Sequence, residues 1–186
     1  IDDSMIFREI LSRGISSDPN IHVVATAIDP FDARDKILEY QPDVLTCDIE
    51  MPKMNGIEFV KRLIPQYPIP IVVVSSVSNA VFDAMNAGAV DFLTKPEIQS
   101  VDSVEVFIEA LISKIKMAAV AKVKTIGSIQ ERAVISNRDC NLHKIIAIGA
   151  STGGTESIYS ILKQLHSNIP GIVIVQHIPP LFSKMF

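Results

Sequence analysis

The sequence predicts an α/β fold with a doubly wound parallel sheet. Two observations support this prediction. The apolar run 69–74 is continuous rather than alternating, as expected for a strand that is covered on both faces. Apolar runs alternate with segments of helical spacing along the chain, which is typical of parallel sheets joined by crossover helices. A linker and the start of a second parallel α/β domain, Rossmann-like in its alternation, are expected to follow.

The expected strands of the first domain are short apolar runs. They cover 22–27, 43–47, 69–74 and 89–94. Each run contains Val beside other apolar residues, which favours an extended conformation. Because a helical pattern separates each run from the next, the strands are expected to pair in parallel.

The expected helices follow from capping residues and apolar spacing. They cover 5–11, 30–40, 56–63, 79–87 and 101–120. Asp3 and Ser4 can cap the first of them, and Ala33, Ile37 and Leu38 are expected on one face of the second. Gly88 is expected to cap a helix at its C-terminus.

The second half of the chain begins with residues 119–143, whose polar side chains show no periodicity and indicate a linker. The elements expected behind it are a strand over 144–148, a helix over 155–165 and a strand over 171–175. Two strands and one helix bury too little apolar surface for a core. We therefore expect a fragment whose second domain continues past Phe186. The expected domains are 1–118, 119–143 and 144–186.

Composition excludes several classes of function. The chain of 186 residues is 48% apolar and 20% charged, with a net charge of −4 and no block of Lys or Arg. We therefore expect no nucleic-acid partner and no binding to an anionic membrane. No apolar run approaches the roughly 18 residues of a membrane span, and no signal peptide is visible. Cys47 and Cys140 form neither a metal motif nor a disulfide framework, so a cytoplasmic protein with Cys47 in its core is expected.

Polar side chains gather where the strands of the first domain are expected to end. Asp48 comes directly after one apolar run, Ser75 after the next and Lys95 after the one that follows. Asp2 and Asp3 form an acid pair at the beginning of the chain. In an open α/β sheet, ligands bind outside the carboxyl ends of the strands, so these side chains are expected to converge.

Phosphoryl transfer would use all of these groups. Clustered carboxylates repel one another unless a cation such as Mg²⁺ joins them, and a lysine supplies a point charge for a phosphoryl group. A carboxylate can itself be the nucleophile and form an aspartyl phosphate. Taken singly, each residue is equally well a solvated loop residue, but their joint occurrence with Met51-Pro52 and Lys95-Pro96 favours the chemical interpretation.

Residues 1–118 resemble a response-regulator receiver domain, which implies a flavodoxin-like fold. The matching pieces are Asp2-Asp3-Ser4, Asp48 with Met51-Pro52 and Gly56, Ser75, and Lys95-Pro96. The resemblance implies that Asp48 is the phosphoacceptor and that Mg²⁺ is needed for its phosphorylation. The implied Mg²⁺ ligands are Asp2, Asp3, Asp48 and the backbone carbonyl of Glu50, with Asp3 the more direct ligand of the acid pair. The implied phosphoryl-contact and switch residues are Ser75, Lys95 and Phe92.

Two points in this comparison stay open. Phe92 is explained equally well as a plain core residue. In the family an apolar first strand directly precedes the acid pair, and only Ile1 remains of it here. We therefore expect the natural protein to start several residues earlier.

A second candidate site lies behind the linker. Residues 149–153 fit the Gly-x-Ser-x-Gly pattern between a strand and a helix, which is the context of a nucleophile elbow. Ser151 would be the nucleophile, and the N-terminus of the helix behind it could stabilise an oxyanion. A hydroxyl needs a base, and His177 ends the next strand. The alternatives are a phosphate-binding turn, although the Walker lysine is absent, and an ordinary loop histidine.

The same residues resemble the start of the chemotaxis protein-glutamate methylesterase catalytic domain. The matching segments are 148–156 and 175–179, and receiver, linker and esterase in this order is the architecture of that family. The resemblance implies hydrolysis of glutamyl methyl esters on chemoreceptors, and deamidation of glutamines in many members. Ser151 and His177 would be the nucleophile and the general base, without a cofactor, and the third triad residue would be an Asp beyond Phe186.

The resemblance also implies a regulatory scheme. A chemotaxis histidine kinase would be the phosphodonor, and methyl-accepting chemoreceptors would be the substrate. The unphosphorylated receiver would cover the esterase cleft, and a phosphoryl group on Asp48 would open it through the side of Ser75 and Phe92. The main alternative is a phosphorylation-dependent binding module without enzymatic activity. A transcriptional regulator would need a helix-turn-helix or a basic patch after the linker, where this chain has a strand, an elbow and a helix.

Overall fold

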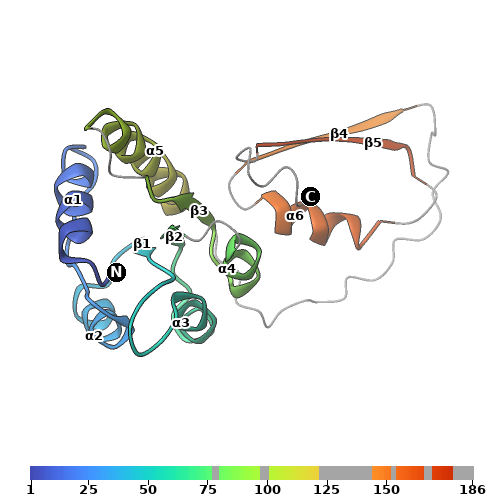
Figure 1. Cartoon of the computed structure of the whole chain (residues 1–186). Helices are drawn as coiled ribbons and strands as arrows, with labels where there is room; N and C mark the ends of the chain where they lie inside the picture. Colours follow the sequence, from blue (N-terminus) through green and yellow to red (C-terminus); the bar gives the residue numbers. More distant parts are fainter. Residues whose placement is uncertain (77–79, 97–100, 122–143, 152–153, 166–168, 178–186) are drawn as a thin grey trace. The chain divides into compact units, whose positions relative to one another are not determined.

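The structure is a computed structural model that describes residues 1–76, 80–96, 101–121, 144–151, 154–165 and 169–177 (Figure 1). The chain divides into two compact units, Ile1–Thr125 and Ile126–Phe186, and each is described here by itself. Within the described ranges, no helix has both the length and the hydropathy that a membrane span requires.

The first unit is built around a parallel sheet. Its strands in the described part of the chain are β1 (Leu45–Cys47), β2 (Ile71–Ser75) and β3 (Asp91–Thr94), in the order β1-β2-β3. Cys47 pairs with Val73, and Ser75 pairs with Thr94. All five residues of β2 are buried, because this strand has a neighbour on each side and helices above and below. The parallel α/β fold predicted from the continuous apolar runs is confirmed.

The first unit has its described helices where they were predicted, although the first continues to Ile15 and the fourth begins only at Val81, without a capping side chain. They are α1 (Met5–Ile15), α2 (Pro30–Tyr40), α3 (Gly56–Leu63), α4 (Val81–Ala87) and α5 (Val101–Ala119). The Ser4 hydroxyl accepts a hydrogen bond from the Phe7 N–H at 3.3 Å and caps α1 as predicted. Gly88 ends α4 at φ 110°, a left-handed conformation that a side chain would strain.

The core has one layer of helices on each face of the sheet. Figure 1 shows α1 and α5 on one side of the strands and α2, α3 and α4 on the other. Val72 and Val74 point toward the α1–α5 side, where Phe7 packs against Phe107 with ring centroids 5.9 Å apart. Leu111 of α5 is completely buried there. This arrangement holds the carboxyl ends of the strands at one edge, where the predicted site residues lie.

The predicted strand over 22–27 is wrong, because this segment is not a strand in the structure. A strand needs a neighbour along its length to complete its hydrogen bonds. Here the Asp2 N–H donates to the Ala27 C=O at 3.1 Å, and the Ile1 C=O accepts from the Asp48 N–H at 2.9 Å. The first two residues thus lie between this segment and the end of β1, and they give the segment support only at its last residue.

The second unit has the predicted strand–helix–strand order. Its described elements are β4 (Ile145–Ala150), α6 (Gly154–Leu162) and β5 (Gly171–Gln176). The two strands are parallel, and their register runs from Ile145 opposite Gly171 to Ala150 opposite Gln176. Most of the predicted linker, residues 122–143, lies outside the described residues.

Cys47 provides a test of this core. Its side chain is completely buried, and burial raises the pKa of its thiol from 9.0 to about 12. Because the folded pKa lies above the unfolded one, the unfolded state loses the thiol proton first as the pH rises. The free energy of unfolding that this thiol contributes is therefore fully present below pH 9.0 and is lost as the pH rises toward 12. In a Cys140→Ser background, we expect iodoacetamide at pH 9.0 to modify Cys47 far more slowly in the folded protein than in urea. Equal rates in the two states would contradict the buried position.

Candidate functional site

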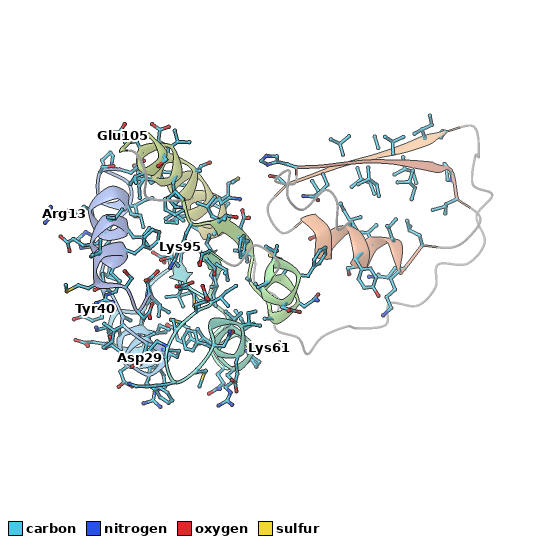
Figure 2. All side chains as sticks on the ribbon, viewed as in Figure 1. Arg13, Asp29, Tyr40, Lys61, Lys95 and Glu105 are labelled. Carbon is cyan, nitrogen blue, oxygen red and sulfur yellow. The ribbon has the colours of Figure 1, made fainter. Side chains whose placement is uncertain are left out.

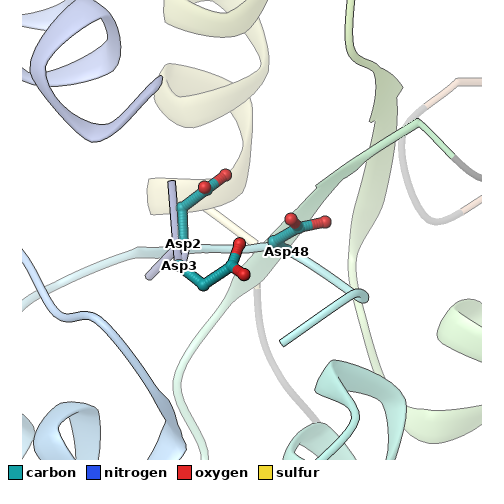
Figure 3. Close-up of side chains that lie close together, drawn as sticks. All are labelled: Asp2, Asp3 and Asp48. Carbon is teal, nitrogen blue, oxygen red and sulfur yellow. The ribbon is translucent and has the colours of Figure 1, made fainter. Parts of the chain in front are cut away.

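Three carboxylates meet at one edge of the sheet in the first unit. Asp48 follows β1 directly, and Asp2 and Asp3 precede α1. One carboxylate oxygen from each of the three lies within 4.8 Å of the other two, and Figure 3 shows the three side chains together. Asp2 and Asp48 are buried, whereas Asp3 is exposed. The convergence predicted from strand ends is therefore present for the acidic residues.

Lys95 joins two of these carboxylates. It follows β3, and its Nζ lies 2.6 Å from Asp2 Oδ2 and 2.6 Å from Asp48 Oδ2. The same ammonium lies 4.5 Å from the centroid of the Phe7 ring, a cation–π distance. Figure 2 shows Lys95 inside the first unit, whereas the side chain of Arg13 points outward. Two buried acids are thus balanced by one partly buried cation.

Burial and charge act against each other at Asp48 and Lys95. Desolvation raises the pKa of the Asp48 carboxyl, and the hydrogen bond and charge of Lys95 oppose that rise without cancelling it. For Lys95, desolvation lowers the pKa, but the hydrogen bonds to Asp2 and Asp48 outweigh it and leave the pKa raised. The lysine therefore carries its charge at neutral pH and offsets part of the negative charge of the two acids.

The backbone fixes the Asp48 side chain. Its Oδ1 accepts from the Ile49 N–H at 2.6 Å and from the Glu50 N–H at 3.4 Å. The first residue of α3, Gly56, packs so closely that a Cβ there would lie 1.9 Å from the Asp48 carbonyl oxygen. The loop after β1 can close over Asp48 only because Gly56 has no side chain.

The remaining predicted residues of this site are Ser75 and Phe92, on the two strands that follow β1, and Glu50, in the loop after β1. Ser75 is completely buried at the end of β2, and Phe92 is 4% exposed in β3. The Glu50 carboxylate accepts a hydrogen bond from the Ser76 hydroxyl at 2.8 Å, at the exposed rim of the site. The ligand role of the Glu50 carbonyl and the switch role of Phe92 stay predictions.

One residue near the acids was not singled out from the sequence. Arg8 of α1 donates from Nη1 to the Asp2 C=O at 2.7 Å and to the Asp3 C=O at 2.9 Å. It therefore fixes the backbone of the acid pair. The available signal was a cation in the second turn of the helix that follows two acids, which is too common a pattern to be informative by itself.

The donor set suits a hard divalent cation. All three converging side chains offer carboxylate oxygens, the ligands that Mg²⁺ prefers. Asp3 is exposed and can reach an ion from solvent, while Lys95 already balances part of the charge of the other two. The site could hold such an ion next to the buried Asp48 carboxylate, and the bound ion could attract a phosphoryl group to that carboxylate.

The second candidate site lies at the ends of β4 and β5. Ser151 follows β4 and His177 follows β5, so each is the first residue past the paired strands. Ser151 Oγ lies 3.3 Å from His177 Nδ1. For the hydroxyl to donate here, Nδ1 must be the unprotonated ring nitrogen, which leaves the proton on Nε2. The pair can act as a nucleophile and its base.

Gln176, beside this pair, was also not predicted from the sequence as a site residue. Its Nε2 donates to the Ser151 C=O at 2.8 Å and to the His177 C=O at 3.0 Å. A glutamine at the end of a strand carries no signal for such bonds in the sequence. Residues 152 and 153 of the predicted elbow lie outside the described residues.

Two family models match the chain. Residues 1–107 match the response regulator receiver domain, and residues 146–186 match the CheB methylesterase. The chain is 50% identical over 186 residues to the protein-glutamate methylesterase/protein-glutamine glutaminase 2 of Syntrophomonas wolfei subsp. wolfei, with 100% of this chain and 54% of that protein covered. The chain thus spans about half the length of the curated relatives that it matches.

Solved structures resemble the first unit. The response regulator domain of Thermotoga maritima CheB has a TM-score of 0.59 and 37% identity, with 65% of this chain and 93% of that chain covered. A second response regulator of Thermotoga maritima, solved in complex with Mg²⁺-BeF, has a TM-score of 0.52 and 22% identity, with 63% and 93% covered. The second likeness supports the fold alone.

Proposed function

The chain belongs to the response regulator receiver family through residues 1–107, and we propose that this part accepts a phosphoryl group on Asp48. The observation that carries the proposal is the bridge from Lys95 Nζ to the Asp2 and Asp48 carboxylates, at 2.6 Å each, beside the exposed Asp3. A buried carboxylate fixed by backbone N–H groups and paired with a lysine is positioned for in-line attack on phosphorus.

The transfer is a displacement at phosphorus. Oδ2 of the Asp48 carboxylate, the oxygen that pairs with Lys95, attacks phosphorus, the bond from phosphorus to the leaving oxygen of the donor breaks, and an aspartyl phosphate forms. Asp2, Asp3, Asp48 and the backbone carbonyl of Glu50 would hold Mg²⁺. When bound, this ion neutralises charge on the transferred group.

Three further residues would respond to the phosphoryl group. Lys95 would move its ion pair from the Asp48 carboxylate to a phosphoryl oxygen, and the Ser75 hydroxyl would donate to another. We propose Phe92 as the aromatic residue that reports this change, since it lies in β3 beside Ser75's strand. The change at Asp48 would thereby reach the surface of the receiver.

Replacing Asp48 tests the phosphoacceptor directly. Incubated with acetyl phosphate and Mg²⁺, the chain should gain the mass of one phosphoryl group, and Asp48→Asn should gain none because the amide is not a nucleophile. Asp35→Asn, which removes an exposed acid from α2, serves as the matched control and should behave as the parent does. Labelling that persists in Asp48→Asn would place the phosphoryl group on another residue.

We further propose that the full-length protein is a methylesterase regulated by this receiver. Support comes from the match of residues 146–186 to the CheB methylesterase and from the 3.3 Å distance between Ser151 Oγ and His177 Nδ1. The proposed substrates are glutamyl methyl esters of methyl-accepting chemoreceptors, with glutamine deamidation as a second activity. The proposed phosphodonor is a chemotaxis histidine kinase, which would place the reaction in the cytoplasm.

The proposed hydrolysis has two stages. His177 takes the Ser151 hydroxyl proton as the oxygen attacks the ester carbonyl, and it then passes the proton to the departing methoxy group, which leaves as methanol. Water next attacks the acyl-serine, with His177 as base, and releases the glutamate carboxylate. An Asp beyond Phe186 would orient His177 and stabilise its imidazolium. We propose the division 1–118, 119–143 and 144–186 for receiver, linker and esterase.

Coupling between the two sites is tested by methanol release from methylated chemoreceptor membranes. The full-length protein should release methanol, and a small phosphodonor should increase the rate in the parent but not in Asp48→Asn. Release without stimulation would retain the enzyme and reject the switch. Absence of release by a folded full-length protein would favour a binding module without enzymatic activity.

A further inference from the structure

We infer that Gln176 is a positioning residue that holds Ser151 and His177 at the correct separation for reaction. The inference rests on the proposed esterase function. Gln176 is the last residue of β5 and pairs with Ala150, the last residue of β4. It therefore lies at the point where the ordered sheet ends and the two reacting residues begin.

The carboxamide of Gln176 ties the two strand ends together. Its two N–H groups are both used on backbone carbonyls, one of Ser151 at 2.8 Å and one of His177 at 3.0 Å. The ladder itself continues past the strand register through the His177 N–H, which donates to the Ala150 C=O at 2.8 Å. Ser151 lies beyond that bond, and its carbonyl is held by Gln176.

The reacting side chains depend on this backbone support. Ser151 and His177 are both exposed in the described part of the chain, so packing against the described residues does not fix them. Their Oγ–Nδ1 distance of 3.3 Å is at the long end of a hydrogen bond. A displacement of about 1 Å between a nucleophile and its base can cost a factor of about 10² in rate. The hydrogen bonds from Gln176 to the backbone carbonyls of Ser151 and His177 should therefore affect the reaction rate directly.

The oxygen of the same carboxamide supports a functional reason for this conformation. Gln176 Oε1 is buried and has no hydrogen-bond partner in the described part of the chain. Leaving a buried acceptor unpaired destabilises the folded state. The conformation that leaves this oxygen unpaired is also the one in which the nitrogen bridges Ser151 and His177. An unpaired buried group of this kind is consistent with a side chain whose role is the geometry of the site.

Substitutions in the full-length protein test the inference. Gln176→Met keeps the approximate length but has no N–H, and we expect kcat for methanol release to fall about 10- to 100-fold with KM and Tm unchanged. Gln176→Glu should lose more, because a carboxylate would face two carbonyl oxygens. Gln164→Met and Gln164→Glu are matched controls, since Gln164, an exposed residue after the end of α6, also donates from Nε2 to a backbone carbonyl, that of Ser160 at 2.9 Å.

The outcomes separate this inference from the function on which it rests. An active parent whose Gln176 variants keep the parental kcat would overturn the inference alone. So would a loss of kcat that only follows a fall in Tm, or that the Gln164 variants share. A folded parent without methanol release would overturn the esterase proposal, and the inference with it.

Discussion

Replacing Ser151 with alanine in the full-length protein should lower methyl ester hydrolysis by about 10⁴-fold or more. The hydroxyl oxygen is the proposed nucleophile, 3.3 Å from His177 Nδ1. Without it no acyl-serine forms, and only binding and oxyanion stabilisation remain. Methanol release from methylated chemoreceptor membranes measures the loss, with Asp48 phosphorylation checked in parallel to show that the receiver still works.

The controls for Ser151→Ala separate the nucleophile from the surrounding polarity. Ser157→Ala removes an exposed hydroxyl from α6 and should leave the rate unchanged. His177→Ala should be nearly as inactive as Ser151→Ala, and the double variant should be no worse, because a nucleophile and its base act as one unit. Residual activity within tenfold of the parent in Ser151→Ala would contradict the assignment.

Replacing Gly56 with alanine should destabilise the first unit by about 3 kcal/mol or more, a large value for one added methyl group. The new Cβ would lie 1.9 Å from the Asp48 carbonyl oxygen and 2.9 Å from Ile49 Cα, and both obstacles are backbone atoms. Alanine favours a helix over glycine by about 1 kcal/mol, which is too little to offset the clash. Because the displaced backbone belongs to Asp48, phosphorylation should be lost as well.

Two readouts check the Gly56→Ala prediction. In a Cys140→Ser background, alkylation of the buried Cys47 across a urea series reports unfolding next to Asp48, and acetyl phosphate labelling reports the phosphoacceptor. Gly149→Ala is the matched control, since no atom of the described residues lies within 4 Å of the Cβ it would add. Parental unfolding and labelling in Gly56→Ala would show that the loop after β1 can move aside without cost.

The outline of both sites could be predicted from the chain because parallel strands end at a common edge. Asp48 and Lys95 are separated by 47 positions, yet each follows a short apolar run, and their side chains lie 2.6 Å apart. The same rule brings Ser151 and His177 together from the ends of two successive strands. The rule concerns strand ends only, so it carried no information on Arg8 or Gln176, whose bonds go to backbone carbonyls.

The sequence by itself determined the alternation of strands and helices, their caps and the residues at the carboxyl ends of the strands. These properties are local, since they depend on apolar spacing and on turn residues within a few positions. Only the tertiary structure decided that 22–27 is not a strand, that Gly56 touches the Asp48 carbonyl and that one lysine bridges two buried acids. Each of these depends on a partner that is distant in the chain or on space left by a neighbour, and local spacing does not encode either.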